Sequence, residues 1–417
     1  MPLKFLIIAP TPFYENRGCH LRIRGEAEAL LEMGHKITVV TYKEGEDLAN
    51  LPIKRAVFSL GKFGKGVSSS WINIPNGIFL FGTALRLCLK ERPEVIYCHL
   101  HEGVAIGFCI KILSRLLSLF TYNPLLVFDG QGGLVLEMKE NNMIKSDFAY
   151  GFFNALEKLI LHFPDLIFVS SRNFYLSFQE KKSKTKTVFL PDTISVFNLE
   201  KKEIANYKRT KEEKIKILSL LKKYFEKEDY NLLNGWIKEE KTIILYSGSF
   251  SKTKGFLNFR EKILSHLAND KGIRFLFGGG NKSEIPGLKE LKQDRIVFIN
   301  KLDALNLKYF LMLGDVGADP KPIDTFEASG KILNYMVAGL PVVCFDQPNN
   351  HYFLDKEGLY AKNEDEFYSK IEELASNKEK RQSIGKRNLD RVFANFTKET
   401  AGKIIETEIK KLIKLEG

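Results

Sequence analysis

The chain has 417 residues, 44% of them hydrophobic, and a formal net charge of +12. A chain of this length is expected to form two domains of about 200 residues each, and this hydrophobic content can fill two cores. The five cysteines include no C-x-x-C pair, which argues against a disulfide framework or a zinc site and favours a reducing cytoplasm. The positive charge suits phosphorylated ligands or an anionic membrane surface. Nucleic acid is not an expected partner, because no RNA-binding or helix-turn-helix signature is present.

No segment is expected to cross a membrane. The first apolar run, Phe5–Ala9, is too short for the core of a signal peptide and is followed by a turn, so it predicts a strand. The longest apolar regions, Trp71–Leu89 and Val104–Phe128, are interrupted by charged residues. Within the second region, Ile106–Phe120 carries two cations among apolar residues, which is typical of an interfacial helix and equally of a core helix with exposed cations. The expected location is cytoplasmic, either free or peripheral on the inner face of a membrane.

Short, nearly continuous apolar runs recur along the chain with room for a helix between them. Such runs are typical of parallel strands that are covered on both faces by helices. The runs of the first half are Phe5–Ala9, Ile37–Thr41, Val95–Cys98, Leu125–Phe128, Leu166–Val169 and Val188–Leu190. The runs of the second half are Thr242–Ser247, Ile273–Phe277, Ile296–Ile299, Val316–Ala318 and Val342–Phe345.

This pattern predicts an α/β protein with two doubly wound, Rossmann-like domains that face a central cleft, followed by C-terminal helices. The predicted parts are a first domain at 1–195, a charged helical linker at 196–241, a second domain at 242–390, and a C-terminal helix at 391–417 that can pack back on the first domain. Ligands of such sheets bind at the carboxyl ends of the strands, so the loops there are the candidate site.

Three loops of the first half carry polar residues after predicted strands. The loop after the first strand contains Arg17, Gly18 and His20, which are candidate ligand contacts, although an ordinary connection to a helix is the alternative. His99 and His101 follow the third strand and are candidates for a general base or for contacts to sugar hydroxyls. A metal site has weak support because no third ligand is in view, and a purely structural role is the other alternative. After the fourth strand, Asp129 and Gln131 can bind hydroxyl groups, and nearby glycines leave room for a ligand.

Two glycine-rich loops of the second half have the geometry that collects phosphate on free backbone N–H groups. The first contains Gly248, Ser249 and Lys254 between a strand and a helix, and the second contains Gly278 and Gly279. Neither has the G-x-x-x-x-G-K-[ST] order of an ATPase loop or the G-x-G-x-x-G order of a dinucleotide site.

The segment Glu327–Cys344 predicts a helix that opens on a polar loop and runs into a buried strand. Ser329 is expected to cap the first turn and Gly339 to end the helix. One face is apolar, and the opposite face carries Lys331, Asn334, Tyr335 and Ala338. A cation, an amide and a phenol beside free N–H groups suit a phosphorylated sugar. Glu327 can accept hydrogen bonds from sugar hydroxyls or merely complement the helix dipole.

Together these motifs resemble the family-4 retaining glycosyltransferases of the GT-B fold, also described as glycosyltransferase group 1. The likeness rests on Ala9–His20, His99–Gly103 and Phe128–Gly132 in the first half, and on Gly248–Gly255 and Glu327–Val343 in the second. It implies transfer of a sugar from a nucleotide-activated donor to a hydroxyl acceptor with retention of configuration. The implied pathway is the synthesis of cell-surface polysaccharide.

The resemblance also implies roles for single residues. The donor would bind the second domain through Gly248, Ser249, Lys254, Gly278, Gly279, Lys331 and Asn334, and the acceptor would bind the first domain. His101, Lys254 and Glu327 would act at the reacting sugar and diphosphate, without a metal or a cofactor. Ser249 stands where the family commonly has an arginine, and Asn334 where it commonly has a glutamate. Two alternatives remain, namely a nucleotide-sugar epimerase of the same fold and a non-catalytic protein that binds a glycan or glycolipid.

Overall fold

The chain forms two compact units in a computed structural model. Unit 1 consists of Met1–Ser195 together with Lys398–Gly417, and unit 2 consists of Val196–Thr397. The structure describes residues 1–14, 18–60, 73–140, 144–180, 185–194, 201–250, 255–266, 272–280, 294–300, 302, 306–322 and 328–416. Within this part of the chain, no helix has the length and hydropathy needed to span a bilayer.

Unit 1 is built on a parallel sheet of seven strands in the order β3-β2-β1-β4-β5-β6-β7. The strands are β1 (Lys4–Ala9), β2 (Lys36–Thr41), β3 (Ile53–Arg55), β4 (Val95–His99), β5 (Leu125–Gly130), β6 (Leu166–Val169) and β7 (Lys186–Phe189). Every residue of β4, β5 and β6 is buried. This burial on both faces explains why their sequences are continuously apolar rather than alternating.

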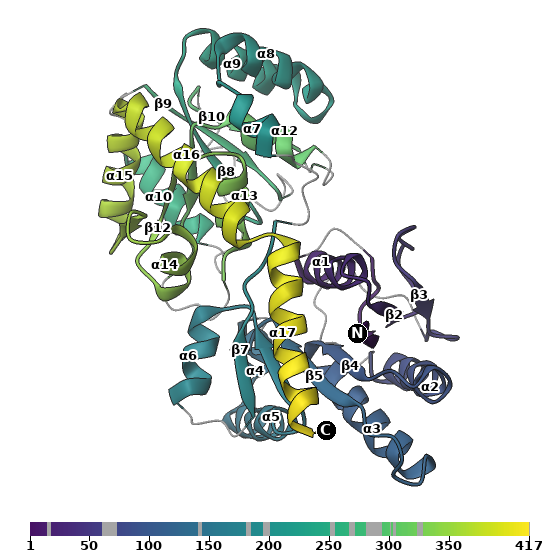
Figure 1. Ribbon diagram of the computed structural model, residues 1–417. Helices are drawn as coiled ribbons and strands as arrows, with labels where there is room; N and C mark the ends of the chain where they lie inside the picture. Colours follow the sequence, from purple (N-terminus) through teal and green to yellow (C-terminus); the bar gives the residue numbers. More distant parts are fainter. Residues whose placement is uncertain are drawn as a thin grey trace. The chain divides into compact units, whose positions relative to one another are not determined.

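Helices cover both faces of this sheet (Figure 1). The helices of unit 1 are α1 (Gly18–Glu32), α2 (Asn73–Glu91), α3 (Leu100–Leu117), α4 (Leu134–Glu140), α5 (Asp147–Ile160), α6 (Arg172–Glu180) and α17 (Lys398–Glu416). Helices α1 and α17 share a core with one face of the sheet, and α2, α3, α5 and α6 share a core with the other.

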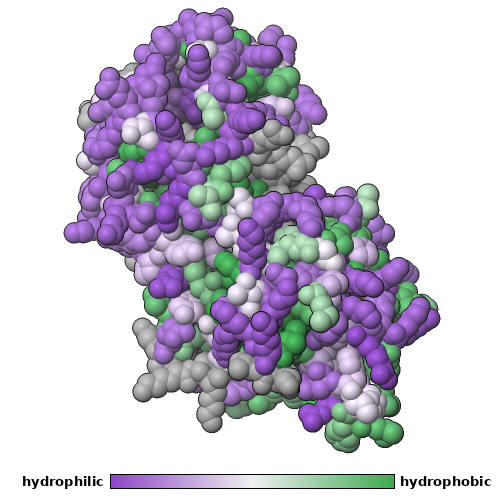
Figure 2. Space-filling model, viewed as in Figure 1, coloured by the Kyte–Doolittle hydropathy of each residue, from purple (hydrophilic) through white to green (hydrophobic). Residues whose placement is uncertain are grey.

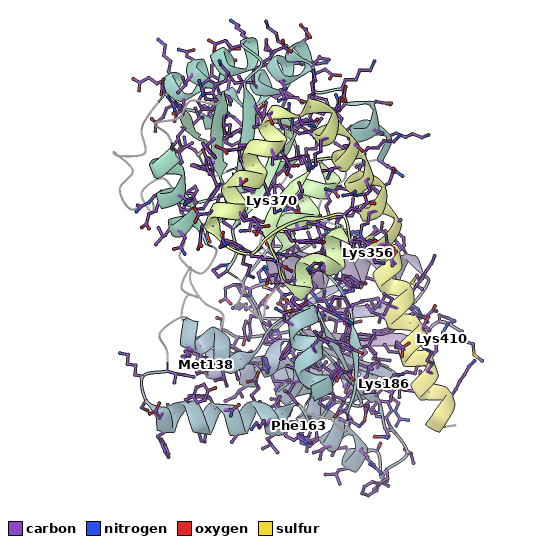
Figure 3. The ribbon with its side chains drawn as sticks, turned by 90° about the vertical axis from the view of Figure 1, so that its left-hand side faces the viewer. Met138, Phe163, Lys186, Lys356, Lys370 and Lys410 are labelled. Atoms are coloured by element: carbon purple, nitrogen blue, oxygen red, sulfur yellow. The ribbon has the colours of Figure 1, made fainter. Side chains whose placement is uncertain are left out.

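The last helix, α17, belongs to unit 1. Its residues Ala401, Ile405 and Ile409 are buried in the core that α1 also covers. Lys186 of β7 forms an ion pair with Glu408 of α17, with 2.7 Å between Nζ and Oε2, and Figure 3 shows Lys186 beside the helix. The helix thus completes one layer of unit 1.

Unit 2 contains a parallel sheet of six strands in the order β10-β9-β8-β11-β12-β13. These strands are β8 (Thr242–Ser247), β9 (Ile273–Gly278), β10 (Ile296–Phe298), β11 (Val316–Asp319), β12 (Val342–Phe345) and β13 (Leu359–Ala361). The chain order reverses between β8 and β11, which is where open sheets of this kind bind ligands. Each strand run expected from the sequence overlaps one of the strands of the two sheets, and β3 and β13 are additional short edge strands.

The helices of unit 2 lie on both faces of this sheet. They are α7 (Lys201–Asn206), α8 (Lys211–Leu220), α9 (Lys227–Lys238), α10 (Phe256–His266), α12 (Leu307–Leu313), α13 (Gly330–Val337), α14 (Pro348–Leu354), α15 (Glu364–Ser376) and α16 (Lys378–Asn395), with a 3₁₀ turn η1 (Lys222–Tyr224). An aromatic core joins one face to α10 and α15. Helix α13 contacts the sheet through β11 and contacts α16 as well.

The segment expected to be a charged linker, 196–241, instead lies within unit 2. Its helices α8 and α9 bury apolar residues such as Leu218 and Trp236. The buried Lys214 ammonium lies 2.7 Å from Asp315 Oδ1, and the Trp236 indole donates to the carbonyl of Asp294. Most of the charges that suggested a linker lie on the solvent faces of these helices, of which α8 packs on α12 and α9 packs on β10.

Candidate functional site

Two glycine loops meet at the carboxyl ends of β8 and β9 in unit 2. The backbone N–H of Gly248 donates to the carbonyl of Gly278 over 2.8 Å. A Cβ atom on Gly279, whose φ is +105°, would lie 2.6 Å from the Gly248 nitrogen. Gly255 has φ +77°, and a Cβ there would lie 1.6 Å from the carbonyl oxygen of Pro320. Glycine is therefore required at these positions because the loops approach too closely for any side chain.

Lys331 lies against these loops. A Cβ on Gly248 would be 3.1 Å from Lys331 Cδ, which places the lysine stem over the first loop. Its ammonium lies 2.9 Å from Asp319 Oδ1 and 4.9 Å from the centre of the Tyr246 ring. Asp319 is completely buried at the end of β11. The structure thus brings together four of the predicted donor-binding residues, Gly248, Gly278, Gly279 and Lys331, and it adds Asp319, which was not among the predicted site residues.

Ser249 and Asn334 lie near this group with different surroundings. The Tyr246 hydroxyl donates to the carbonyl of Ser249 over 2.6 Å, which holds the loop after β8. Asn334 is half-buried on α13. Lys254 and Glu327, two of the residues expected to take part in catalysis, lie outside the described residues, as does Arg17.

Two expectations for α13 are wrong. Ser329 occupies the N-cap position, but its side chain makes no capping hydrogen bond. Tyr335 does not face a ligand: it is completely buried, accepts a hydrogen bond from the backbone N–H of Ser247 at 2.8 Å, and donates to the carbonyl of Ala318 at 3.1 Å. Ala338 is buried too. The helix packs against both the sheet and α16, so its second face is also largely covered.

A buried group of charges lies at the carboxyl ends of β4 and β5 in unit 1. Arg22 of α1 donates to both carboxylate oxygens of Asp129, at 2.8 Å from Nε and 2.6 Å from Nη2. It also lies 3.0 Å from Glu26 Oε1 and donates to Asp192 over 3.0 Å. Gln131 donates to Asp129 over 3.2 Å. Asp129 therefore binds both Gln131 and Arg22, and Arg22 was not among the predicted site residues.

The pKa values of this group follow from burial and pairing. Burial alone would raise the pKa of Asp129, but the charge of Arg22 and its hydrogen bond lower that pKa below the usual range. Burial, followed by the charge of Asp129, raises the pKa of Glu26 to about 7. The Tyr97 hydroxyl donates to Glu26 over 2.5 Å. Glu26 is thus a buried carboxyl group that ionises near neutral pH.

The pKa of Glu26 predicts a pH dependence of stability. A pKa raised from 4.5 to about 7 means that the folded state binds this proton more tightly than the unfolded state. The stability contribution is present below about pH 4.5 and is lost as the pH rises through about 7, by up to about 3 kcal/mol. We expect Glu26→Gln to flatten this part of the profile in urea denaturation measured from pH 5 to pH 8. An unchanged slope in the variant would contradict the assignment.

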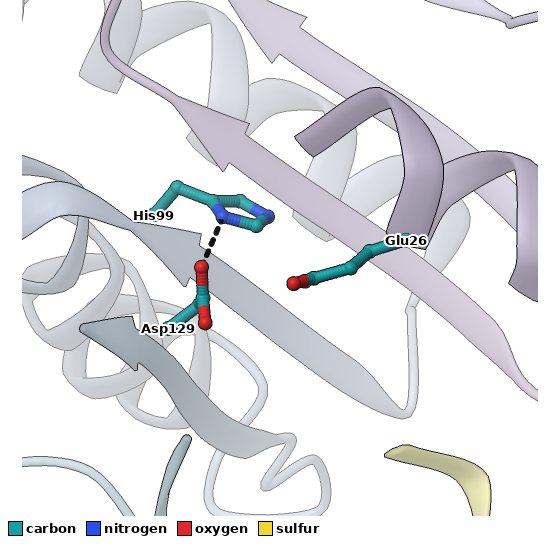
Figure 4. Close-up of side chains that lie close together, drawn as sticks. All are labelled: Glu26, His99 and Asp129. Carbon is teal, nitrogen blue, oxygen red and sulfur yellow. Dashed lines mark hydrogen bonds and ion pairs between the residues drawn. The ribbon is translucent and has the colours of Figure 1, made fainter. Parts of the chain in front are cut away.

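Glu26, His99 and Asp129 have the spacing of a cation site. Their ligand atoms all lie within 4.8 Å of one another, and Figure 4 shows His99 Nδ1 directed at Asp129, with 3.2 Å between the atoms. Arg22, however, already places a guanidinium against both carboxylates. A metal ion would have to displace this cation, so the chemistry of the group is that of an arginine-neutralised cluster. The absence of a metal remains a prediction.

The remaining candidates of unit 1 have distinct positions. His101 is in the first turn of α3; its Nε2 lies 3.4 Å from Glu157 Oε1 and its ring packs on Phe128. His20 is buried with its ring against Phe13, so it does not offer the ring to a ligand. Gly18 begins α1, and a Cβ there would meet no protein atom within 4 Å, so its predicted contact with a ligand stays a prediction.

Comparison with known proteins bears on the segment that holds the glycine loops and Lys331. Residues 241–377 match the family model for glycosyl transferases, group 1. The matched segment runs from just before β8 into the residues after α15. A search of curated protein sequences found no match to the chain.

Solved structures with two such units are similar over the whole chain. Sucrose-phosphate synthase from Thermosynechococcus elongatus has a TM-score of 0.69 and 16% identity, covering 99% of this chain and 100% of its own. HepE from Anabaena in complex with UDP-glucose has a TM-score of 0.65 and 13% identity, covering 98% and 100%. A trehalose-6-phosphate protein from E. coli bound with UDP-2-fluoro glucose has a TM-score of 0.63 and 11% identity, covering 98% and 99%. The fold is GT-B, with two parallel-sheet α/β units and a helical C-terminus.

Proposed function

We propose that the protein is a glycosyltransferase that moves a sugar from a nucleotide-activated donor to a hydroxyl acceptor. The observation that carries this proposal is the meeting of Gly248, Gly279 and Lys331 at the strand ends of unit 2, inside the segment that matches glycosyl transferases, group 1. HepE and the E. coli protein, which share the fold, were solved with UDP-glucose and with a UDP-sugar analogue. Backbone amides and a cation at strand ends suit the diphosphate of such a donor.

In this proposal, unit 2 stabilises the leaving diphosphate. Negative charge grows on the diphosphate as the glycosidic bond breaks. Hydrogen-bond donors that the close-packed loops hold in place before the reaction therefore stabilise the transition state more than the ground state. Lys331 supplies a cation, and we propose that Lys254, which precedes Gly255 in the sequence, supplies a second one. Ser249 and Asn334 replace an arginine and a glutamate, so we expect weaker holding of the diphosphate and the ribose than with those charged groups.

In unit 1, the proposed role is binding of the acceptor. Gln131 is half-buried at the strand end and is held by the buried Asp129, whose carboxylate Arg22 keeps ionised. His101 and Glu327 are proposed to contact the transferred sugar, and retention of configuration, as in family 4, is part of the proposal. The acceptor is a hydroxyl group of a glycan, a glycolipid or a small molecule. The cytoplasm is proposed as the location because all five cysteines are free thiols.

A thermal-shift series with UDP-, GDP- and ADP-glucose tests donor binding. A donor at about 100 times its dissociation constant adds about 2.7 kcal/mol to the folded state, so the correct nucleotide raises the melting temperature. Free glucose serves as the control and is expected to have no effect. A melting temperature that no nucleotide sugar changes would overturn the proposal.

Two other functions are separated by following the bound donor without an acceptor. Isomerisation of the sugar would favour an epimerase. Binding with neither hydrolysis nor transfer to any offered hydroxyl would favour a non-catalytic binding protein. Slow hydrolysis of the donor, accelerated when an acceptor is added, is the result expected for a transferase.

A further inference from the structure

Helix α5 exposes apolar residues that a helix of a globular protein ordinarily buries. Phe148 is 87% exposed, and Phe152 and Leu159 are each 56% exposed. These residues follow one another at spacings of four and seven, which places them on one stripe of the helix. Ile160 is the buried residue of α5. One apolar stripe of α5 therefore faces outward, whereas Leu156 and Ile160 of the same helix pack in the core.

The end of α3 exposes a second apolar group. Leu117 is 64% exposed, and in the following turn Leu119 is 83% and Phe120 64% exposed. Leu119 and Phe120 have φ values of 51° and 66°, a left-handed conformation that is unfavourable for such residues. The turn is nevertheless fixed by hydrogen bonds, including that from the backbone N–H of Phe120 to the carbonyl of Arg115 at 2.8 Å. The fold holds two large apolar side chains outward on a defined turn.

The two groups lie on elements that cover the same face of the unit 1 sheet. Helices α3 and α5 contact each other on the same face of the sheet. Phe108 of α3 stacks on Phe163, which follows α5, with 3.8 Å between ring centres. Figure 2 shows hydrophobic residues gathered at the far end of α3. We call the outward residues of these two elements the α3–α5 surface; they are Leu116, Leu117, Leu119, Phe120, Phe148, Phe152 and Leu159.

Cations lie among these apolar residues. The guanidinium of Arg115 lies 5.5 Å from the centre of the Phe120 ring, and the ammonium of Lys139 lies 5.9 Å from the centre of the Tyr150 ring. Lys158 is exposed beside Leu159 on α5. Among the acidic side chains of α5 and its end that the structure describes, Asp165 is paired with Lys111 at 2.6 Å, Glu157 lies beside His101, and Asp147 is exposed. The surface is thus apolar with a positive rim.

We propose that the α3–α5 surface docks on the headgroup region of an anionic lipid bilayer. Water-soluble monomers seldom expose apolar residues in such a cluster, so the surface is expected to have an occupant. Arginine and lysine beside aromatic rings can bury their stems and keep their charges at lipid phosphates, which matches an anionic interface better than an uncharged protein groove. The net charge of +12 adds long-range attraction to such a membrane. This inference does not rest on the proposed transfer reaction.

Co-sedimentation of the full chain with vesicles tests the proposal. We expect pelleting with vesicles of phosphatidylcholine and phosphatidylglycerol, and much less with phosphatidylcholine alone. Two double variants, Leu119→Ser/Phe120→Ser and Phe148→Ser/Phe152→Ser, should each lower the partition coefficient at least about tenfold because each removes two inserted side chains. Leu220→Ser is the matched control: Leu220 is 51% exposed on α8 of unit 2, and its loss should leave pelleting unchanged. High salt should weaken binding by the wild type without abolishing it.

Three results would overturn the proposal. One is the absence of pelleting with anionic vesicles at low salt, and another is undiminished pelleting of both double variants. The third is self-association that the double variants abolish, without vesicle binding, which would assign the surface to a second copy of the chain. The altered side chains are exposed, so urea denaturation should show unchanged stability. The variants should also keep any thermal shift with UDP-glucose, which separates failure of this proposal from failure of the transferase proposal.

Discussion

Replacing Arg22 with methionine lowers the stability of unit 1 by about 3 to 5 kcal/mol, which is the cost of removing one partner from a buried ion pair. The guanidinium lies within 3.0 Å of carboxylate oxygens of Asp129, Glu26 and Asp192. Without it, Asp129 remains as a buried carboxylate with reduced compensation. Urea denaturation, with amide hydrogen exchange in β5 as the local readout, measures the loss.

The same helix supplies a matched control for this prediction. Arg24 pairs with Glu28 at 2.7 Å but is partly exposed, so Arg24→Met should cost about 1 kcal/mol or less. The double variant Arg22→Met/Asp129→Asn removes both charges of the closest pair and should recover part of the loss. The prediction is contradicted if Arg22→Met lowers the free energy of unfolding no more than Arg24→Met does. The buried cluster would then not stabilise unit 1.

Replacing Lys331 with methionine is expected to lower sugar transfer about a hundredfold, the usual effect of removing one preorganised group that stabilises developing charge. The Lys331 stem lies over Gly248, where we propose that the diphosphate binds, and its ammonium is paired with Asp319. Lys331→Arg should restore part of the rate, because it retains a cation that can contact phosphate. Donor affinity, from titration with UDP-glucose, and single-turnover rates are the two measurements.

Loss of Lys331 also leaves Asp319 buried without its partner, so a purely structural effect must be separated. The neutral double variant Lys331→Met/Asp319→Asn removes the whole pair and should fold while remaining impaired in transfer. Strand β11 provides the control at its other end, where Lys214 lies 2.7 Å from Asp315. Lys214→Met/Asp315→Asn removes an equally buried pair away from the glycine loops. Equal impairment of transfer by the two double variants would exclude a specific role for Lys331.

Most strands could be predicted because burial on both faces leaves a continuous apolar run. The edge strands β3 (Ile53–Arg55) and β13 (Leu359–Ala361) are three residues long and not fully buried, so their sequences carry little of that signal. Helix periodicity correctly placed Lys331, Asn334 and Tyr335 on one side of α13. Periodicity reports which residues share a face, but not what covers that face. Because α13 lies against both the sheet and α16, Tyr335 is buried, and its hydroxyl hydrogen-bonds to the backbones of β8 and β11 rather than to a ligand.

The sequence predicts which loops carry the candidate site residues, but not which of their side chains contact one another. Asp129 stood out because it follows a strand, yet its partner Arg22 is 107 positions away in the sequence. Parallel sheets bring such distant loops to one edge, and a single sequence does not show which side chains then meet. The same limit applies to Asp319 and Lys331. The glycines were easier to interpret, because two backbones can approach closely only where the residue is glycine, and glycine is visible in the sequence.

The location of α17 has a consequence for how the protein matures. The ribosome delivers the seven strands of unit 1 before unit 2, but residues 398–416, which cover one side of that sheet, emerge only after unit 2. Until unit 2 has been synthesised, α17 is therefore missing from unit 1. Phe5, Ile7 and Val39 on that side of the sheet stay incompletely covered during this time. Unit 2 has its whole sequence in one continuous stretch and can finish folding earlier. A fragment ending at residue 195 would lack this cover, and is expected to aggregate unless residues 398–416 are supplied as a separate peptide.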